Sequence, residues 1–372
     1  MRAAVLFTSP GKVSIEDVVV DRPQRREVLV RLVATGLCHS DGHYLEGGYT
    51  LTRPIVLGHE GAGVVEAVGE DVTYVRPGDH VVSLALGFCG QCEWCLSGRP
   101  ALCDQENLAR RPGEPPRVRL GDGTECTQKS GLATFAEQML VHENALVRID
   151  PQFPLDRAAL LGCGVSTGVG AVIRTAKVPP GASVAVIGCG GIGLNCVQGA
   201  VLAGASRIVA IDINAGKLDR AREFGATDVI DNSAGDAVEQ LRDLLPGSGG
   251  VDYSFEALGR PETYRLAFDI LRPAGTATVI GLFDGTVELP AQAFLAGELR
   301  IQGSKLGSIR ARQDVPFLLD LYAAGRLKLD ELVSSRISLD QINEAFAAIG
   351  EGSVARSVVV FELQASSRPG ER

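Results

Sequence analysis

The sequence predicts an α/β protein in which a parallel, doubly wound sheet is joined to a second, β-rich domain. From about residue 179 onward, short apolar strands alternate with helical stretches. That alternation is typical of a parallel sheet covered on both faces by right-handed crossovers. Before it, short β-branched runs are separated by Gly and Pro, which is typical of a twisted barrel or sandwich.

In the first third of the chain, the turn Pro77-Gly78-Asp79 precedes one of three expected strands, which cover residues 28–33, 63–68 and 80–84. Residues 108–131 have a different composition, with three prolines, four arginines and no clear hydrophobic period. This composition favours a solvated loop there, and a lid or a partner contact is the alternative.

The later pattern predicts a regular series of strands and helices. Expected strands cover 183–187, 207–211 (ending at Asp212), 228–230, 251–255 and 276–280, and expected helices cover 193–203, 218–224, 237–244 and 261–271. Helical patterns return at 315–324 and 339–349, before a strand at 357–361. The polar tail from Gln364 is expected to be frayed.

Length and composition restrict the class of protein. At 372 residues the chain is long enough for two domains of about 150 residues each. Its formal charge of -9 and the lack of a basic stripe argue against nucleic-acid binding. No apolar run approaches the roughly 20 residues that cross a bilayer, and the N-terminus turns polar at Thr8, so we expect no membrane partner and a cytoplasmic location.

Nine cysteines without an export signal favour metal binding over disulfides. Cys126, Cys189 and Cys196 lie outside the clusters and are interpreted as ordinary thiols. The run Cys89, Cys92, Cys95 and Cys103 fits four thiolates around a structural zinc ion, since two-residue spacings let a short loop wrap the ion. Disulfide pairing or accidental clustering is the alternative.

A second zinc site is suggested by residues that are far apart in the sequence. Cys163 stands between two glycines, and His59 lies in the turn Gly58-His59-Glu60. With Cys38 they supply three ligands, and three protein ligands with one open position are typical of catalytic zinc. A buried histidine and two buried thiols are the alternative.

The pattern Gly188-x-Gly190-Gly191-Ile192-Gly193 follows one expected strand and opens a helix, the context that a dinucleotide-binding turn requires. Pyrophosphate then lies on the exposed N–H groups of the helix start. Asp212 ends the next strand, where a carboxylate can bind the adenosine ribose hydroxyls and repel a 2′-phosphate. This arrangement favours NAD over NADP, and a solvated strand end is the alternative for Asp212.

With these motifs in place, the chain resembles the zinc-dependent alcohol dehydrogenases of the medium-chain dehydrogenase/reductase superfamily, over nearly all of residues 3–361. Within that family it is most similar to bacterial members, including the nicotinoprotein type, which retains its cofactor. The resemblance implies a GroES-like β-barrel catalytic domain at 1–164, with the structural zinc lobe, completed by 307–372. It implies a Rossmann NAD-binding domain at 165–306 and at least a homodimer, paired through the last strand of the cofactor sheet near 301–304.

The resemblance also implies roles for individual residues. Cys38, His59 and Cys163 match catalytic zinc ligands, beside which Glu60 matches an exchangeable acid and Asp41 the carboxylate that orients His59. Ser40 matches the hydroxyl that takes the substrate proton, and His43 the outlet of the relay. The expected cofactor contacts are His39 and Arg356 on the pyrophosphate, Asp212 and Lys217 on the adenosine ribose, and Thr167 and Ile192 on the nicotinamide. Ile280 and Leu282 are also expected to bind the cofactor.

The resemblance implies NAD-linked oxidation of a primary alcohol, which can be bulky, allylic or aromatic, to an aldehyde. Ala85 stands where an aromatic residue often narrows the pocket, which favours a wide one. The alternative is oxidation of a formaldehyde–thiol adduct, with an arginine between Arg110 and Arg119 as the anion contact. A non-catalytic dinucleotide-binding protein is a further alternative, against which the intact metal and relay residues argue.

Overall fold

The computed structural model describes residues 1–104, 108–247, 249–350 and 356–361. The expected frayed tail from Gln364 lies outside these residues. The chain divides into two compact units. The first unit consists of Met1–Ala85, Ala109–Leu160 and Val333–Arg372, and the second of Leu86–Leu108 and Leu161–Leu332.

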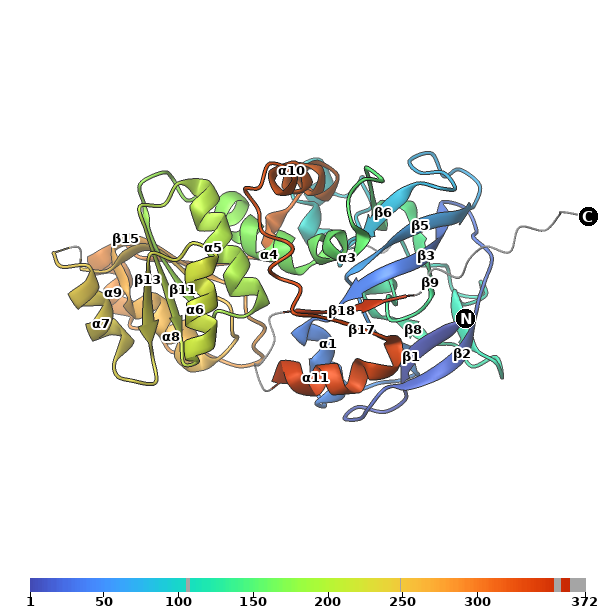
Figure 1. Ribbon diagram of the computed structural model, residues 1–372, viewed down its shortest axis with the longest axis horizontal. Coiled ribbons are helices and arrows are strands. Elements are labelled where there is room, and N and C mark those ends of the chain that lie inside the picture. Colours follow the sequence, from blue (N-terminus) through green and yellow to red (C-terminus); the bar gives the residue numbers. More distant parts are fainter. Residues whose placement is uncertain (105–107, 248, 351–355, 362–372) are drawn as a thin grey trace, which may run out of the picture. The chain divides into compact units, whose positions relative to one another are not determined.

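Two sheets form the first unit (Figure 1). One has the strand order β7-β2-β1-β4-β8, and the other has the order β10-β6-β5-β3-β18-β17 with β9 also paired to β3. The long β3 lies at the centre of the second sheet because it pairs with β5, β9 and β18. The strands are β1 (Arg2–Leu6), β2 (Ser14–Val20), β3 (Glu27–Gly36), β4 (Ile55–Val56), β5 (Gly61–Val68), β6 (His80–Ser83), β7 (Val118–Leu120), β8 (Thr127–Gln128), β9 (Gln138–His142), β10 (Leu146–Ile149), β17 (Ser335–Ile337) and β18 (Ser357–Val360).

Alternating buried positions give this unit its core. On β3 the side chains of Val28, Val30 and Leu32 are buried and pack with those of β5, β6 and β9, as the two-residue period of a strand requires. Helices α1 (His39–Leu45), α3 (Leu155–Ala158) and α11 (Ile342–Gly350) complete the unit. Of these, α1 follows β3 directly and contacts α11, so the end of β3 leads into the residues of the candidate metal site.

The second unit confirms the predicted doubly wound parallel sheet (Figure 1). Its strands run in the order β13-β12-β11-β14-β15-β16 and all pairs are parallel. The order reverses between β11 and β14, and in such sheets ligands bind where the order reverses, at the carboxyl ends of the strands. The strands are β11 (Ser183–Ile187), β12 (Arg207–Asp212), β13 (Asp228–Asp231), β14 (Val251–Glu256), β15 (Leu271–Val279) and β16 (Arg300–Gly303).

Helices cover both faces of that sheet. Contacts link α5 with α6, and separately α7 with α8. The helices are α4 (Gly164–Gly170), α5 (Gly191–Ala203), α6 (Ala215–Glu223), α7 (Ala237–Leu244), α8 (Pro261–Asp269), α9 (Ala291–Gly297) and α10 (Ala311–Ala323). In the described part of the chain, no single helix is long and apolar enough to cross a membrane. One bent pair of helical segments, Leu155–Gly162 and Gly164–Ala176, meets the length and composition of a membrane span when the two are taken together.

The cysteine-rich segment, residues 86–104, groups with the second unit by its contacts, and its assignment to the catalytic domain stays a prediction. It contains α2 (Glu93–Leu96) and a 3-10 turn (Pro100–Leu102) that contacts a second 3-10 turn (Leu306–Ser308). The guanidinium of Arg312 on α10 also lies 5.2 Å from the ring centre of Phe88. These contacts explain why the segment groups with residues 306–312.

Most of segment 108–131 is the exposed loop that the sequence predicts, with residues 111–115 and 121–125 exposed, but parts of the segment are anchored. It contains β7 and β8, and the side chains of Arg110 and Arg117 are only 8% and 10% exposed. Both arginines pair with the buried carboxylate of Glu27, and Arg110 also pairs with Asp21. The sequence pattern missed this anchoring because the acidic partners lie about 90 residues earlier in the chain.

Candidate active site and metal centres

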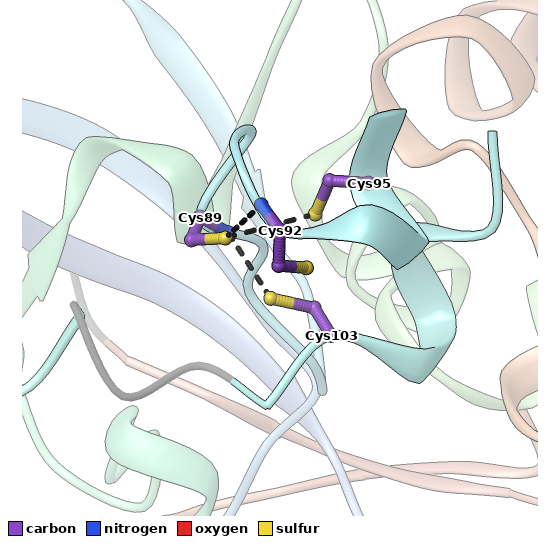
Figure 2. Close-up of side chains that lie close together, drawn as sticks. All are labelled: Cys89, Cys92, Cys95 and Cys103. Carbon is purple, nitrogen blue, oxygen red and sulfur yellow. Dashed lines mark hydrogen bonds between the residues drawn. The ribbon is translucent and has the colours of Figure 1, made fainter. Parts of the chain in front are cut away.

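Four cysteines of the second unit face one another (Figure 2). The sulfurs of Cys89, Cys92, Cys95 and Cys103 all lie within 4.8 Å of one another, and those of Cys89 and Cys95 are 3.9 Å apart. Tetrahedral zinc with Zn–S bonds of about 2.3 Å requires sulfurs about 3.8 Å apart. The donor set and its spacing therefore fit a structural zinc ion with little rearrangement.

The electrostatics of the four thiols suit metal capture. Hydrogen bonds from the backbone N–H groups of Gln91 and Cys92 lower the pKa of Cys89 to about 7, so a thiolate is available near neutral pH. Desolvation raises the pKa of Cys95 to about 12 in the metal-free protein. Since the thiolate is the form that binds a metal, zinc binding at this site must release protons.

A second donor cluster lies in the first unit. Ligand atoms of Cys38, His59 and Glu60 lie within 4.8 Å of one another, although Cys38 follows β3 and the other two residues precede β5. The turn is possible because Gly58 has φ +89°, and a Cβ there would lie 2.6 Å from the backbone nitrogen of Phe135. The tight Gly-His-Glu turn thus directs His59 toward Cys38.

Asp41 orients His59 within this cluster. Its Oδ1 lies 3.1 Å from His59 Nδ1 and accepts a hydrogen bond from the Gly58 N–H. An ionised carboxylate only accepts hydrogen bonds, so it places the proton on Nδ1 and leaves Nε2 for a metal ion. Burial by itself lowers the pKa of His59, but the charge and hydrogen bond of Asp41 outweigh it and raise that pKa well above its ordinary value.

Glu60 is a fully buried acid whose charge needs compensation. Its Oε1 lies 3.2 Å from the Arg356 guanidinium, which also donates to the Leu37 carbonyl. Its Oε2 accepts no hydrogen bond from the residues that the structure describes. Burial raises the pKa of Glu60 to about 7 although Arg356 opposes the shift. A buried carboxylate oxygen without a donor fits a site that holds a cation.

The hydroxyl of Ser40 lies beside this donor cluster. Its Oγ is 3.3 Å from Cys38 Sγ and 3.2 Å from His59 Nε2. His39 and His43 are on the same helix, α1, and their rings meet edge to face with centres 5.1 Å apart. His39 is exposed, whereas Ser40 and His43 are half-buried. The proton-accepting and proton-releasing groups that the sequence suggested therefore lie on one short helix.

The third expected ligand, Cys163, belongs to the second unit. It is the residue before α4, and its carbonyl accepts a hydrogen bond from the Thr167 N–H in the first turn of that helix. Thr167 is buried on the same helix. The glycines on both sides of Cys163 leave its half-buried thiol without bulky neighbours in sequence.

The glycine turn between β11 and α5 has the geometry of a dinucleotide site. Gly188 has φ +88°, and a Cβ on Gly193 would lie 1.7 Å from the Gly188 carbonyl oxygen. Around Gly190, by contrast, a Cβ would meet no described atom within 4 Å. The first and third glycines thus allow the turn and the close packing of helix on strand, and the second leaves the backbone open to a pyrophosphate group. Gly191 and Ile192 begin α5 beside this space.

Asp212 ends β12 next to this turn. Its carboxylate is buried and accepts hydrogen bonds from the N–H groups of Cys189, Ile213 and Asn214. These contacts fix the orientation of the carboxylate at the carboxyl edge of the sheet. Lys217 lies in the first turn of α6, and its backbone N–H donates a hydrogen bond to the side chain of Asn214.

Glu256, at the end of β14, is a positioning residue that the sequence analysis missed. Its Oε1 accepts hydrogen bonds from the Leu258 and Gly259 N–H groups and from the Thr263 hydroxyl, and its carbonyl accepts one from Ile280 N–H. It thereby fixes the loop that carries Ile280 and the exposed Leu282. The available signal was an acid directly after the expected strand at 251–255.

Two family models match the chain in the regions that contain these sites. The alcohol dehydrogenase GroES-like domain matches residues 24–151, and the zinc-binding dehydrogenase domain matches residues 191–324. A relative described as alcohol dehydrogenase class-3, from Myxine glutinosa, is 39% identical over 370 residues, covering 96% of this chain and 97% of that protein. The chain belongs to the zinc-dependent alcohol dehydrogenases of the medium-chain dehydrogenase/reductase superfamily.

Solved structures of this family share the fold. A zinc-binding domain alcohol dehydrogenase from Burkholderia ambifaria has a TM-score of 0.92 and 36% identity, covering 97% of this chain and 99% of the other. Benzyl alcohol dehydrogenase from Acinetobacter calcoaceticus has a TM-score of 0.89 and 32% identity, with the same coverage. As a zinc alcohol dehydrogenase, the protein is an oxidoreductase that uses zinc and a nicotinamide cofactor.

Proposed function

We propose that this zinc alcohol dehydrogenase oxidises a primary alcohol to an aldehyde and transfers the hydride to NAD. The observation that carries the proposal is the arrangement of Ser40, whose hydroxyl contacts both Cys38 Sγ and His59 Nε2. A proton acceptor so close to two zinc-type ligands suits the deprotonation of an alcohol bound there.

In this proposal, Cys163 supplies the third zinc ligand, and the residues have separate tasks. Zinc bound here would supply electrophilic polarisation of the alcohol oxygen, and the nicotinamide would accept the hydride. Ser40 accepts the alcohol proton at Oγ and passes its own proton on toward His43, which releases it to solvent. Asp41 holds the His59 ring, and Glu60, paired with Arg356, supplies a nearby carboxylate that can join the metal ligands.

The choice of NAD rests on Asp212. At about 4 Å and an effective dielectric constant of about 20, a 2′-phosphate would be repelled by roughly 4 kcal/mol per unit charge pair. Thr167 and Ile192 would contact the nicotinamide, and Ile280 and Leu282 would also contact the cofactor. Arg356 forms an ion pair with Glu60 and donates a hydrogen bond to the Leu37 carbonyl. We therefore propose that the exposed His39 is the more accessible pyrophosphate contact and that the buried Arg356 is the less accessible one.

We further propose that the alcohol pocket is wide and accepts allylic or aromatic alcohols. Ala85 offers only a methyl group where a larger side chain would narrow the pocket, and a relative of 32% identity is described as benzyl alcohol dehydrogenase. A second candidate is the oxidation of a formaldehyde–thiol adduct. Two of the arginines available for its anion, Arg110 and Arg117, are paired with Glu27, which makes this candidate weaker.

A substrate panel tests these proposals. Zinc-loaded protein is assayed with aliphatic, allylic and aromatic alcohols, with added NAD, with added NADP, and with an artificial hydride acceptor alone. We expect NAD reduction with primary alcohols, fastest with aromatic or allylic ones. Turnover only with the artificial acceptor would indicate a retained cofactor of the nicotinoprotein type. Activity on formaldehyde only with a cellular thiol would favour the second candidate, and no turnover in any arm would refute both.

For the assembly, we propose a homodimer or homotetramer built by pairing β16 with its copy. β16 is an edge strand of the six-stranded sheet and carries the partly exposed Ile301. An open edge is available for strand pairing. Sedimentation at micromolar concentration should show no monomer, and a monomeric protein would refute the proposal.

A further inference from the structure

A third group of metal-type donors belongs to α1, the helix labelled in Figure 1, and shares no residue with either zinc cluster. His39 and His43 are one helical turn apart, and Glu46 follows three residues later, at the end of the helix. One ligand atom from each of these residues lies within 4.8 Å of the other two. None of the three is a ligand in the proposed catalytic or structural zinc site.

Helix geometry separates this group from the catalytic cluster. With about 100° per residue, His39, His43 and Glu46 fall within an arc of about 60°, whereas Asp41 points about 170° away from the middle of that arc. Asp41 is fully buried and contacts His59, so the inner face of α1 serves the catalytic cluster. The three donors therefore form the outer face of the same helix.

The chemistry and reach of these donors fit a divalent transition metal. Two imidazoles and a carboxylate are ligands that Zn²⁺ prefers, and histidines four residues apart on a helix bind zinc in other proteins. Tetrahedral ligands at about 2.0–2.1 Å from zinc lie about 3.3 Å apart. His43 Nδ1 and Glu46 Oε2 are already 3.9 Å apart, and the Glu46 side chain is 60% exposed, so small rotations of accessible side chains suffice.

We propose that His39, His43 and Glu46 bind one additional Zn²⁺ ion, which inhibits the enzyme. The bound ion takes up the imidazole nitrogens of His39 and His43. Those groups are then unable to contact the cofactor pyrophosphate or to release the substrate proton. The inhibitory effect rests on the proposed function of these histidines, whereas the binding of the ion rests only on the geometry of α1.

Equilibrium dialysis against Zn²⁺, followed by metal analysis, tests the binding. The starting material is the full chain already loaded at its cysteine clusters. Wild type should bind one further equivalent. His39→Gln and His43→Gln should each weaken this binding at least tenfold, and Glu46→Gln should weaken it about fivefold. Glu70→Gln, which changes another exposed glutamate of the same unit, is the matched control and should bind as wild type does.

Alcohol oxidation measured against Zn²⁺ concentration tests the consequence. Glu46→Gln should require about fivefold more Zn²⁺ than wild type for half inhibition, with each protein's rate before added Zn²⁺ as its own reference. Absence of a further equivalent, or equal binding by wild type and all three site variants, would overturn the proposal. The wild-type protein could bind a further Zn²⁺ ion that the variants do not bind, and yet show no alcohol turnover. That result would support the metal site and refute the proposed function.

Discussion

Replacing Asp41 with Asn should weaken zinc binding at the catalytic cluster without unfolding the protein. Asp41 is fully buried, and its Oδ1 lies 3.1 Å from His59 Nδ1 and accepts the Gly58 N–H at 3.2 Å. Asn can place its carbonyl oxygen at the same position and accept both hydrogen bonds. The substitution therefore removes the negative charge and keeps both hydrogen bonds, and it places an amide nitrogen where Oδ2 now lies 3.1 Å from the same imidazole nitrogen.

The size of the effect follows from that lost charge. A hydrogen bond to a charged group contributes about 1.5–3 kcal/mol, against roughly 1 kcal/mol for a neutral one. The loss of about 0.5–2 kcal/mol, at about 1.4 kcal/mol per factor of ten, makes the binding of the ion roughly 2–30-fold weaker. Changes to carboxylates behind a zinc-bound histidine typically cost about 10–100-fold, so we expect about tenfold.

Chelator competition with metal analysis measures this effect. Wild type and Asp41→Asn are dialysed against a series of EDTA concentrations. The variant should lose one ion at about tenfold lower chelator than wild type does, while the ion at the four-cysteine cluster is retained equally and serves as an internal control. Asp79→Asn, in the same unit, is a matched control and should behave as wild type. Equal retention of both ions by Asp41→Asn and wild type would refute the proposed role of Asp41.

Three further predictions concern the other parts of the molecule. Cys38→Ser should abolish alcohol turnover, and an undiminished rate would remove zinc activation from the mechanism. Asp212→Gly should raise the NADP-to-NAD ratio of kcat/KM by up to on the order of 1000-fold, from about 4 kcal/mol of lost repulsion; an unchanged ratio would mean that the ribose contact is misassigned. Glu27→Ala should lower the free energy of urea unfolding by about 3–5 kcal/mol, because it leaves Arg110 and Arg117 without their shared carboxylate; a loss below about 1 kcal/mol would contradict this. Burial tends to raise the pKa of Glu27, but its arginine partners lower it below 4.5. Its stabilisation is therefore present above pH 4.5 and is lost as the pH falls through the folded pKa, which the same unfolding measurement at decreasing pH checks.

Short-range patterns made the parallel sheet predictable. The strand at 183–187 and the helix at 237–244 were predicted with the bounds that the structure has, because strand and helix periods are local properties of the sequence. The helix expected at 261–271 ends earlier, at Asp269, and Leu271 begins β15. Ile270 and Leu271 at this boundary are both apolar, so hydrophobic period alone does not place the end of the helix.

The sequence by itself determined the groups whose members are neighbours along the chain. The four cysteines lie within one short segment, and the glycine turn is a single strand-to-helix connection, so spacing alone restricts their geometry. The pairs Glu60–Arg356 and Glu27–Arg110, by contrast, join residues far apart in the chain. Nothing local to an arginine specifies which buried acid it will meet. Only the tertiary structure decided those pairs, because burial in a folded core makes each charge depend on the opposite charges brought beside it by the packing of distant segments.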